Sequence, residues 1–202
     1  MQIIESENVD LISPFPLNEI KRLVGWLHCY RTMLEFDGGP KTEEEHEFYW
    51  RNIIQTYPTW GVIDKNNKLN YKHAAPLIGF FWAEPTNFSN VYMHLTSTRK
   101  AWASGLMDEG AHALIKELFE KNPGLLRLSG AILNSNKPAK NFAKRVGMKQ
   151  DGLFKDFVTQ NGQPKAVAHF GLTRSDLWAG YSAAAKQPNP VTTDNSSEQT
   201  LT

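Results

Sequence analysis

Two side chains in the middle of the chain could accept a proton in a reaction. His94 alternates with Tyr92 and Thr96, so the three would share one face of a strand. Imidazole has an ordinary pKa of about 6.5, which suits proton transfer near neutral pH. Glu84 ends the preceding apolar run and is a second candidate base. A histidine in a strand can equally have a structural role, so both residues stay candidates.

The other reactive residues do not form a recognisable site. The six histidines show no spacing typical of metal ligands, so we expect no bound metal. The single cysteine, Cys29, lies at an apolar helix end, where the adjacent His28 cannot easily face it; this argues against a thiol nucleophile. One cysteine excludes an intrachain disulfide and favours the cytoplasm as the compartment.

The composition is that of one compact domain. The chain has 202 residues, of which 41% are hydrophobic, enough for a single core. A formal net charge of +1 argues against a nucleic-acid binder, although Lys137, Lys140, Lys144 and Arg145 would make one basic helix. Since no apolar run reaches the roughly 20 residues that a membrane helix needs, we expect no membrane association.

The hydrophobic pattern predicts an α/β chain with a mixed sheet. The nearly continuous apolar run 77–83 indicates a strand buried on both faces. We expect one domain over residues 1–180 and a disordered polar tail over residues 183–202. Strands are expected at 3–12, 59–63, 77–83, 91–96, 126–133, 153–159 and 166–172, and helices after Pro16, after Thr42, and over 106–120 and 138–146.

Residues 136–148 carry the most specific pattern. Asn136 is followed three residues later by the small Ala139, and an aliphatic-Gly-apolar triplet, residues 146–148, ends twelve residues after the Asn. This spacing resembles that of the GNAT acetyltransferases, with Met148 in place of the usual Phe. Helix capping would explain Asn136 and the glycine separately, but it would not explain the whole spacing.

Two further segments resemble the same family. Residues 150–178, with an Asn-Gly turn at 161–162, look like the closing strands of the ribosomal-protein and related N-terminal acetyltransferase branch. Residues 100–105 keep only the outline of the family's pyrophosphate loop, in which small residues precede a helix. Trp102 is unusual there, and it either stacks on the adenine or obstructs the loop. The alternative for this segment is an ordinary helix start with solvated cations.

The resemblance implies a GNAT fold, with a mixed central sheet and helices on both faces. It also implies direct transfer of an acetyl group from acetyl-CoA to a primary amine, on a small molecule or a protein; a homodimer is left open. The strand before the loop would polarise the thioester carbonyl through backbone N–H groups. The implied contacts to acetyl-CoA are Leu95, Thr96, Ser97, Lys100, Ala103, Ser104, Gly105, Asn136 and Lys140, and the candidate bases are Glu84 and His94.

One position departs from the family in a way that affects catalysis. Many members donate a proton to the departing thiolate from a Tyr seven residues after the Asn, and that position is Ala143 here. Either water or another residue serves as the acid, or catalysis has been lost. A second hypothesis is therefore a catalytically degenerate GNAT-like binding or assembly module, for example one encoded by a phage.

Overall fold

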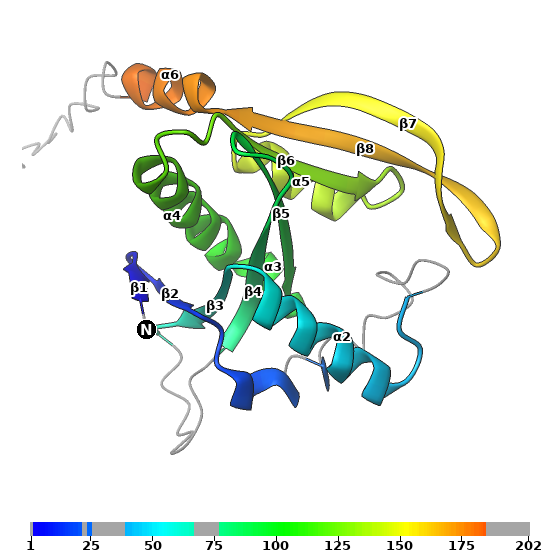
Figure 1. Cartoon of the computed structure of the whole chain (residues 1–202). Coiled ribbons are helices and arrows are strands. Elements are labelled where there is room, and N and C mark those ends of the chain that lie inside the picture. The colour runs from blue at the N-terminus through cyan, green and yellow to red at the C-terminus, as the bar shows by residue number, and fades with distance from the viewer. Residues whose placement is uncertain (1, 22–23, 26–38, 67–76, 185–202) are drawn as a thin grey trace, which may run out of the picture.

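The computed structural model describes residues 2–21, 24–25, 39–66 and 77–184. These residues form an eight-stranded mixed sheet with helices packed on it (Figure 1). The strands lie in the order β1-β2-β3-β4-β5-β6-β8-β7, and the β5–β6 pair is parallel whereas the other neighbours are antiparallel. The predicted α/β fold with a mixed sheet is confirmed.

The elements follow the predicted order up to residue 172 with two exceptions, and the helix α6 after that residue was not predicted. The strands are β1 (Gln2–Glu5), β2 (Val9–Ser13), β3 (Thr59–Asp64), β4 (Leu77–Pro85), β5 (Asn90–Ser97), β6 (Arg127–Leu133), β7 (Lys149–Gln160) and β8 (Gln163–Thr173). The helices are η1 (Leu17–Glu19), α2 (Glu43–Thr56), α3 (Arg99–Ser104), α4 (Leu106–Lys121), α5 (Lys137–Arg145) and α6 (Arg174–Ala184). The first two residues of the expected tail belong to α6, and residues 185–202 lie outside the described ranges.

The first exception is the single strand predicted over residues 3–12, which is a hairpin of β1 and β2. The turn is held by Glu109 of α4, whose carboxylate accepts hydrogen bonds from the Ser6 hydroxyl at 2.6 Å and the Asn8 backbone N–H at 2.7 Å. Burial acts to raise the pKa of Glu109, but the hydrogen bonds together outweigh burial and lower it. A contact 101 residues away in sequence is invisible to a local pattern, so the turn was not predicted.

The second exception is the segment before α4. Residues 99–104 form the short helix α3 rather than an open loop, and Thr98 caps it by accepting the N–H of Ala101. Gly105 then separates α3 from α4 with a positive φ of 77°, a conformation that glycine adopts without steric strain. The chain therefore changes direction at Gly105, and α4 begins directly after it.

Helices cover both faces of the sheet, as predicted. Along β4, Phe80 and Trp82 pack into a cluster with α2, while Phe81 and Ala83 pack into a larger cluster with α4 and α5. Because side chains alternate along a strand, the two clusters lie on opposite faces, and β4 is buried on both. The helix expected after Thr42 is α2, and Thr42 caps it in a capping box with Glu45; Phe48 of this helix is 69% exposed.

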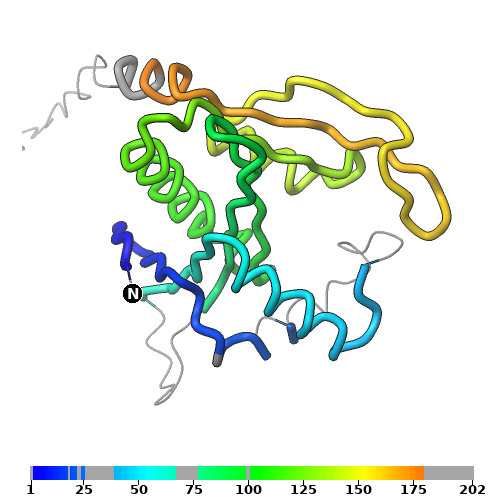
Figure 2. Tube along the Cα trace, in the orientation of Figure 1, coloured from blue at the N-terminus to red at the C-terminus, as the bar shows by residue number. Residues whose placement is uncertain are grey.

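Strands β7 and β8 form a long hairpin beyond the rest of the sheet (Figure 2). Strand β6 pairs with β8 only over residues 167–173 of β8, so the tip of the hairpin extends past the end of β6. The hairpin turns at Asn161 and Gly162, both with positive φ, as the Asn-Gly signal predicted. A bulge between Phe154 and Val158 interrupts the ladder of the hairpin.

Candidate active site

The sheet opens between β5 and β6. These strands pair only at Asn90–Tyr92 with Arg127–Ser129, and beyond those residues each continues along its other neighbour. Figure 1 shows the two strands diverging from that end. The second halves of β5 and β6 therefore share no hydrogen-bonded pairing, and we refer to this break in the ladder as the slot.

The backbone of β5 offers donors to this slot. The N–H of Thr98 donates to Ile78 of β4 at 2.9 Å, and backbone groups alternate sides along a strand, so Thr96 also faces β4. Leu95 and Ser97 therefore face the opposite side, toward β6. Of the three residues expected to polarise a carbonyl, these two direct their N–H groups to the slot.

A helix start lies close in sequence to the end of β5. Gly105 provides no side-chain cap for α4, whereas Thr98 caps the preceding helix α3. The first backbone N–H groups of the 16-residue helix α4 therefore lack a side-chain acceptor, which is the arrangement that binds anions. Ala103, Ser104 and Gly105 are exposed here; Lys100 belongs to α3, and its side chain lies outside the described part of the structure.

Helix α5 carries the other residues of the expected acetyl-CoA site. Asn136 caps the helix by accepting the N–H of Ala139 at 3.1 Å, and the Lys140 ammonium donates to Asn134 at 2.9 Å. Trp102 of α3 packs edge-to-face on Phe142 of α5, with ring centroids 5.1 Å apart. The indole therefore packs α3 against α5, and this contact gives the large side chain of Trp102 a structural role.

The two candidate bases, predicted as alternatives, form one pair. The Nε2 of His94 on β5 lies 3.2 Å from a carboxylate oxygen of Glu84 on β4, and the imidazole stacks on Trp82 at 4.6 Å between ring centroids. Burial lowers the pKa of His94, and the carboxylate of Glu84 opposes that shift. The imidazole is therefore neutral near pH 7 and able to accept a proton.

A second pair on the same face was missed. The hydroxyl of Tyr92 on β5 lies 3.1 Å from Nδ1 of His169 on β8, and the rings of Tyr92 and His94 are 6.4 Å apart. Alternation had already placed Tyr92 beside His94, but His169 was considered only as a metal ligand. The sequence separation of 77 residues explains why the pair could not be predicted from spacing.

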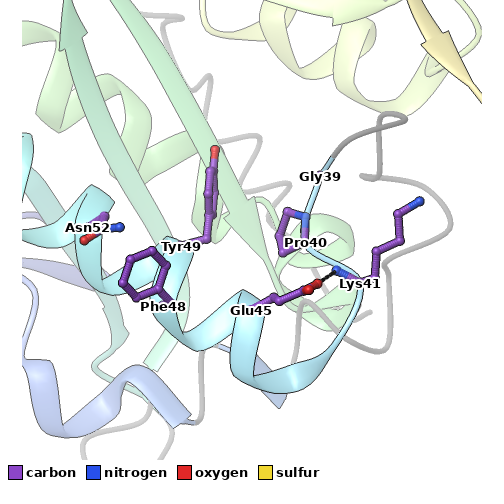
Figure 3. Close-up of a pocket in the computed structure, with 7 residues that line it drawn as sticks. All are labelled: Gly39, Pro40, Lys41, Glu45, Phe48, Tyr49 and Asn52. Atoms are coloured by element: carbon purple, nitrogen blue, oxygen red, sulfur yellow. Dashed lines mark hydrogen bonds between the residues drawn. The ribbon is translucent and has the colours of Figure 1, made fainter.

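A hollow lies at the start of α2. It has a volume of about 420 Å³ and is lined by Gly39, Pro40, Lys41, Glu45, Phe48, Tyr49 and Asn52 (Figure 3). Figure 3 shows the Tyr49 ring rising from α2 toward the strands. Burial raises the pKa of Tyr49, and the charge of Glu84 raises it further, so the hollow lies within electrostatic range of the Glu84–His94 pair.

Comparison with known proteins identifies the family. A model of the acetyltransferase (GNAT) domain matches residues 11–149. The chain belongs to this family. No curated protein sequence matches the chain. GNAT membership confirms the fold expected from residues 136–148 and makes the chain an acetyl-CoA-dependent acetyltransferase by class.

Solved structures agree with the GNAT fold. A GNAT acetyltransferase from Bacillus anthracis is 16% identical, with a TM-score of 0.71 over 85% of this chain and 98% of that one. A ribosomal L7/L12 α-N-protein acetyltransferase, solved with coenzyme A, is 16% identical, with a TM-score of 0.69 over 85% and 98%. A ribosomal-protein-S5-alanine acetyltransferase from Vibrio fischeri is 15% identical, with a TM-score of 0.66 over 87% and 98%.

The described residues contain neither a metal-binding cluster nor a helix suited to a bilayer. No group of three or more His, Cys, Asp or Glu residues in these ranges could hold a metal ion. None of the helices in the described part of the chain combines the length and the apolar character that crossing a bilayer requires.

Proposed function

We propose that this GNAT domain transfers an acetyl group from acetyl-CoA to a primary amine by direct attack in a ternary complex. One observation carries the proposal: the slot between β5 and β6 lies beside the Glu84–His94 pair. A thioester in the slot would meet backbone donors and a neutral base together. Because the reaction needs mainly two positioned substrates and one proton acceptor, this arrangement is sufficient.

Acetyl-CoA would lie along the slot and over the helix starts. The N–H groups of Leu95 and Ser97 would stabilise the negative charge that develops on the thioester oxygen. The pyrophosphate would meet the uncapped start of α4, where the helix dipole favours an anion. The remaining proposed contacts are the buried Thr96, the segment residues Lys100, Ala103, Ser104 and Gly105, and Asn136 and Lys140 of the α5 region.

His94 would accept the proton of the attacking amine. If Nε2–H donates to Glu84, the Nδ1 nitrogen carries the lone pair and takes the proton. The carboxylate then stabilises the imidazolium and fixes the orientation of the ring, as the acidic partner of a catalytic histidine does elsewhere. The Glu84–His94 pair would thus act as one base rather than as two alternatives.

The acceptor would enter from the face that carries α2. The hollow beside Tyr49 offers aromatic and charged groups within range of the base. Structural neighbours that acetylate ribosomal proteins make a protein N-terminus our first acceptor to test. We further propose the cytoplasm as the compartment, because the chain has a single cysteine.

The test is transfer of labelled acetyl from acetyl-CoA to a panel of N-terminal peptides, polyamines and small amines. We expect at least one acceptor to be acetylated on its amine. His94→Gln should lower kcat about 100-fold with acetyl-CoA affinity retained. The same substitution at His112, which is exposed on α4, is the control and should change neither kcat nor affinity. Full activity of His94→Gln would remove His94 from the mechanism.

Ala143 favours one competing function, a degenerate binding or assembly module. An alanine has no hydroxyl to donate, and this one is 2% exposed and packs in the core cluster. If the wild-type chain binds acetyl-CoA but acetylates no amine in the panel, this second function replaces the first.

A further inference from the structure

Between Tyr92 and His169, the α2 face of the sheet is lined by small side chains of β6. Ser129 is the register partner of Tyr92, and Ala131 is the register partner of His169. Both are small, so the Tyr92 ring can cross over β6 and place its hydroxyl 3.1 Å from Nδ1 of His169. Tyr92 is also the last residue of β5 that pairs with β6, so its side chain lies where the slot begins to open.

The far side of His169 is enclosed by aromatic rings. Phe154 and Phe157 of β7 contact the imidazole, with ring centroids 4.5 and 5.7 Å away. The bulge in β7, with Asp156 at a φ of 50°, turns both rings to the same imidazole. The Nε2 atom is buried among the described residues without a hydrogen-bond partner, so the polar contact of His169 is made through Nδ1 to Tyr92.

We propose that Tyr92 is the acid that protonates the departing thiolate, positioned by His169. The inference rests on the proposed acetyl transfer and deepens it, because α5 has Ala143 where an acid was expected. Phenols and alkyl thiols are of similar acid strength, so a tyrosine can protonate a thiolate as the carbon–sulfur bond breaks. The ring centroids of Tyr92 and His94 lie 6.4 Å apart on one face, so a thioester bound beside them would have an acid and a base within reach.

The proton balance of the step closes. The amine nitrogen forms a bond to the thioester carbon, and its surplus proton passes to Nδ1 of His94. The carbon–sulfur bond then breaks, its electron pair goes to sulfur, and the sulfur takes the hydroxyl proton of Tyr92. An N–H on Nδ1 of His169 would hold the resulting phenolate. After the products leave, the proton on His94 returns to Tyr92 through solvent, and both pairs are restored.

The experiment compares two acyl donors, acetyl-CoA and its oxygen-ester analogue, in the full-length chain. An alkoxide is a poorer leaving group than a thiolate and depends more on an acid. Tyr92→Phe should therefore lower kcat about 100-fold with acetyl-CoA and by a larger factor with the ester, while acetyl-CoA affinity is unchanged. Tyr57→Phe, which removes a hydroxyl from a half-buried tyrosine at the end of α2, is the matched control and should retain wild-type kcat.

Two variants of His169 test its positioning role. His169→Asn keeps an N–H donor near the position of Nδ1 and should restore most of the kcat that His169→Leu loses, with KM unchanged in both. An equal loss of kcat with the two donors in Tyr92→Phe would refute the acid role, and so would wild-type kcat in that variant. Only the Glu84–His94 pair would then remain in the mechanism. An inactive wild type would instead refute the proposed transfer, and this inference with it.

Discussion

The charge of Glu84 should be visible in the pH dependence of catalysis. The Glu84→Gln substitution keeps the size and hydrogen-bonding capacity of the side chain but removes the negative charge beside Nε2 of His94. Burial already lowers the pKa of His94, and Glu84 opposes that effect. Without the carboxylate, the pKa of His94 should fall further, so the ascending limb of kcat/KM should move to lower pH.

The size of the rate loss follows from the geometry of the pair. The Nε2–carboxylate distance is 3.2 Å, and the side chains of His94 and Glu84 are 32% and 44% exposed, so water screens the interaction. An ion pair of this kind contributes about 1 kcal/mol to an imidazolium, which predicts a loss in kcat of about fivefold. The loss is small because the neutral glutamine still orients the ring.

The assay measures kcat and kcat/KM for the acceptor from about pH 5 to about pH 9, at saturating acetyl-CoA, with an acceptor whose amine titrates above that range. Glu120→Gln, an exposed exchange on α4 that removes the same charge far from the pair, is the control and should leave the profile unchanged. An ascending limb that moves to higher pH in Glu84→Gln, or stays in place at full rate, would refute the reasoning.

Three further outcomes test other parts of the structure. Gly105→Glu should weaken acetyl-CoA binding more than Gly105→Gln in an equilibrium titration, because both strain a backbone with φ of 77° but only one places a carboxylate at the start of α4. Gly79→Ala should destabilise the fold by about 1–3 kcal/mol in urea unfolding, because the new Cβ would clash with the sulfur of buried Met107. Gly124→Ala is the control and should not destabilise the fold, because its new Cβ would meet nothing closer than 3.9 Å. Removing residues 185–202 should move the melting temperature by less than about 2 °C, since their polar composition contributes little to a core.

The parts of the fold that local rules govern were predictable. The capping box at Thr42 and the doubly buried β4 follow from residue type and hydrophobic period. The hairpin at residues 2–13 was missed because its turn is stabilised by Glu109, far along the chain. The helical form of residues 99–104 was missed because Ala101 and Ala103, which are small enough for a phosphate loop, are also strong helix formers.

The candidate site was predicted residue by residue but not as an arrangement. Alternation correctly placed Tyr92 and His94 on one face, yet their partners are set by the register of neighbouring strands. The pairing of His94 with Glu84 depends on β4 lying antiparallel to β5. The pairing of Tyr92 with His169 crosses β6, and no local signal in the sequence carries that information.

The most direct test of the central claim is calorimetric titration of the full-length chain with acetyl-CoA, paired with thermal melting at the same ligand concentrations. A slot bordered by Leu95 and Ser97, with an uncapped helix start nearby, predicts one bound acetyl-CoA per chain. It also predicts a melting temperature that rises with ligand concentration, because a ligand that binds only the folded state stabilises it. No heat and no shift in melting at millimolar acetyl-CoA would contradict the account.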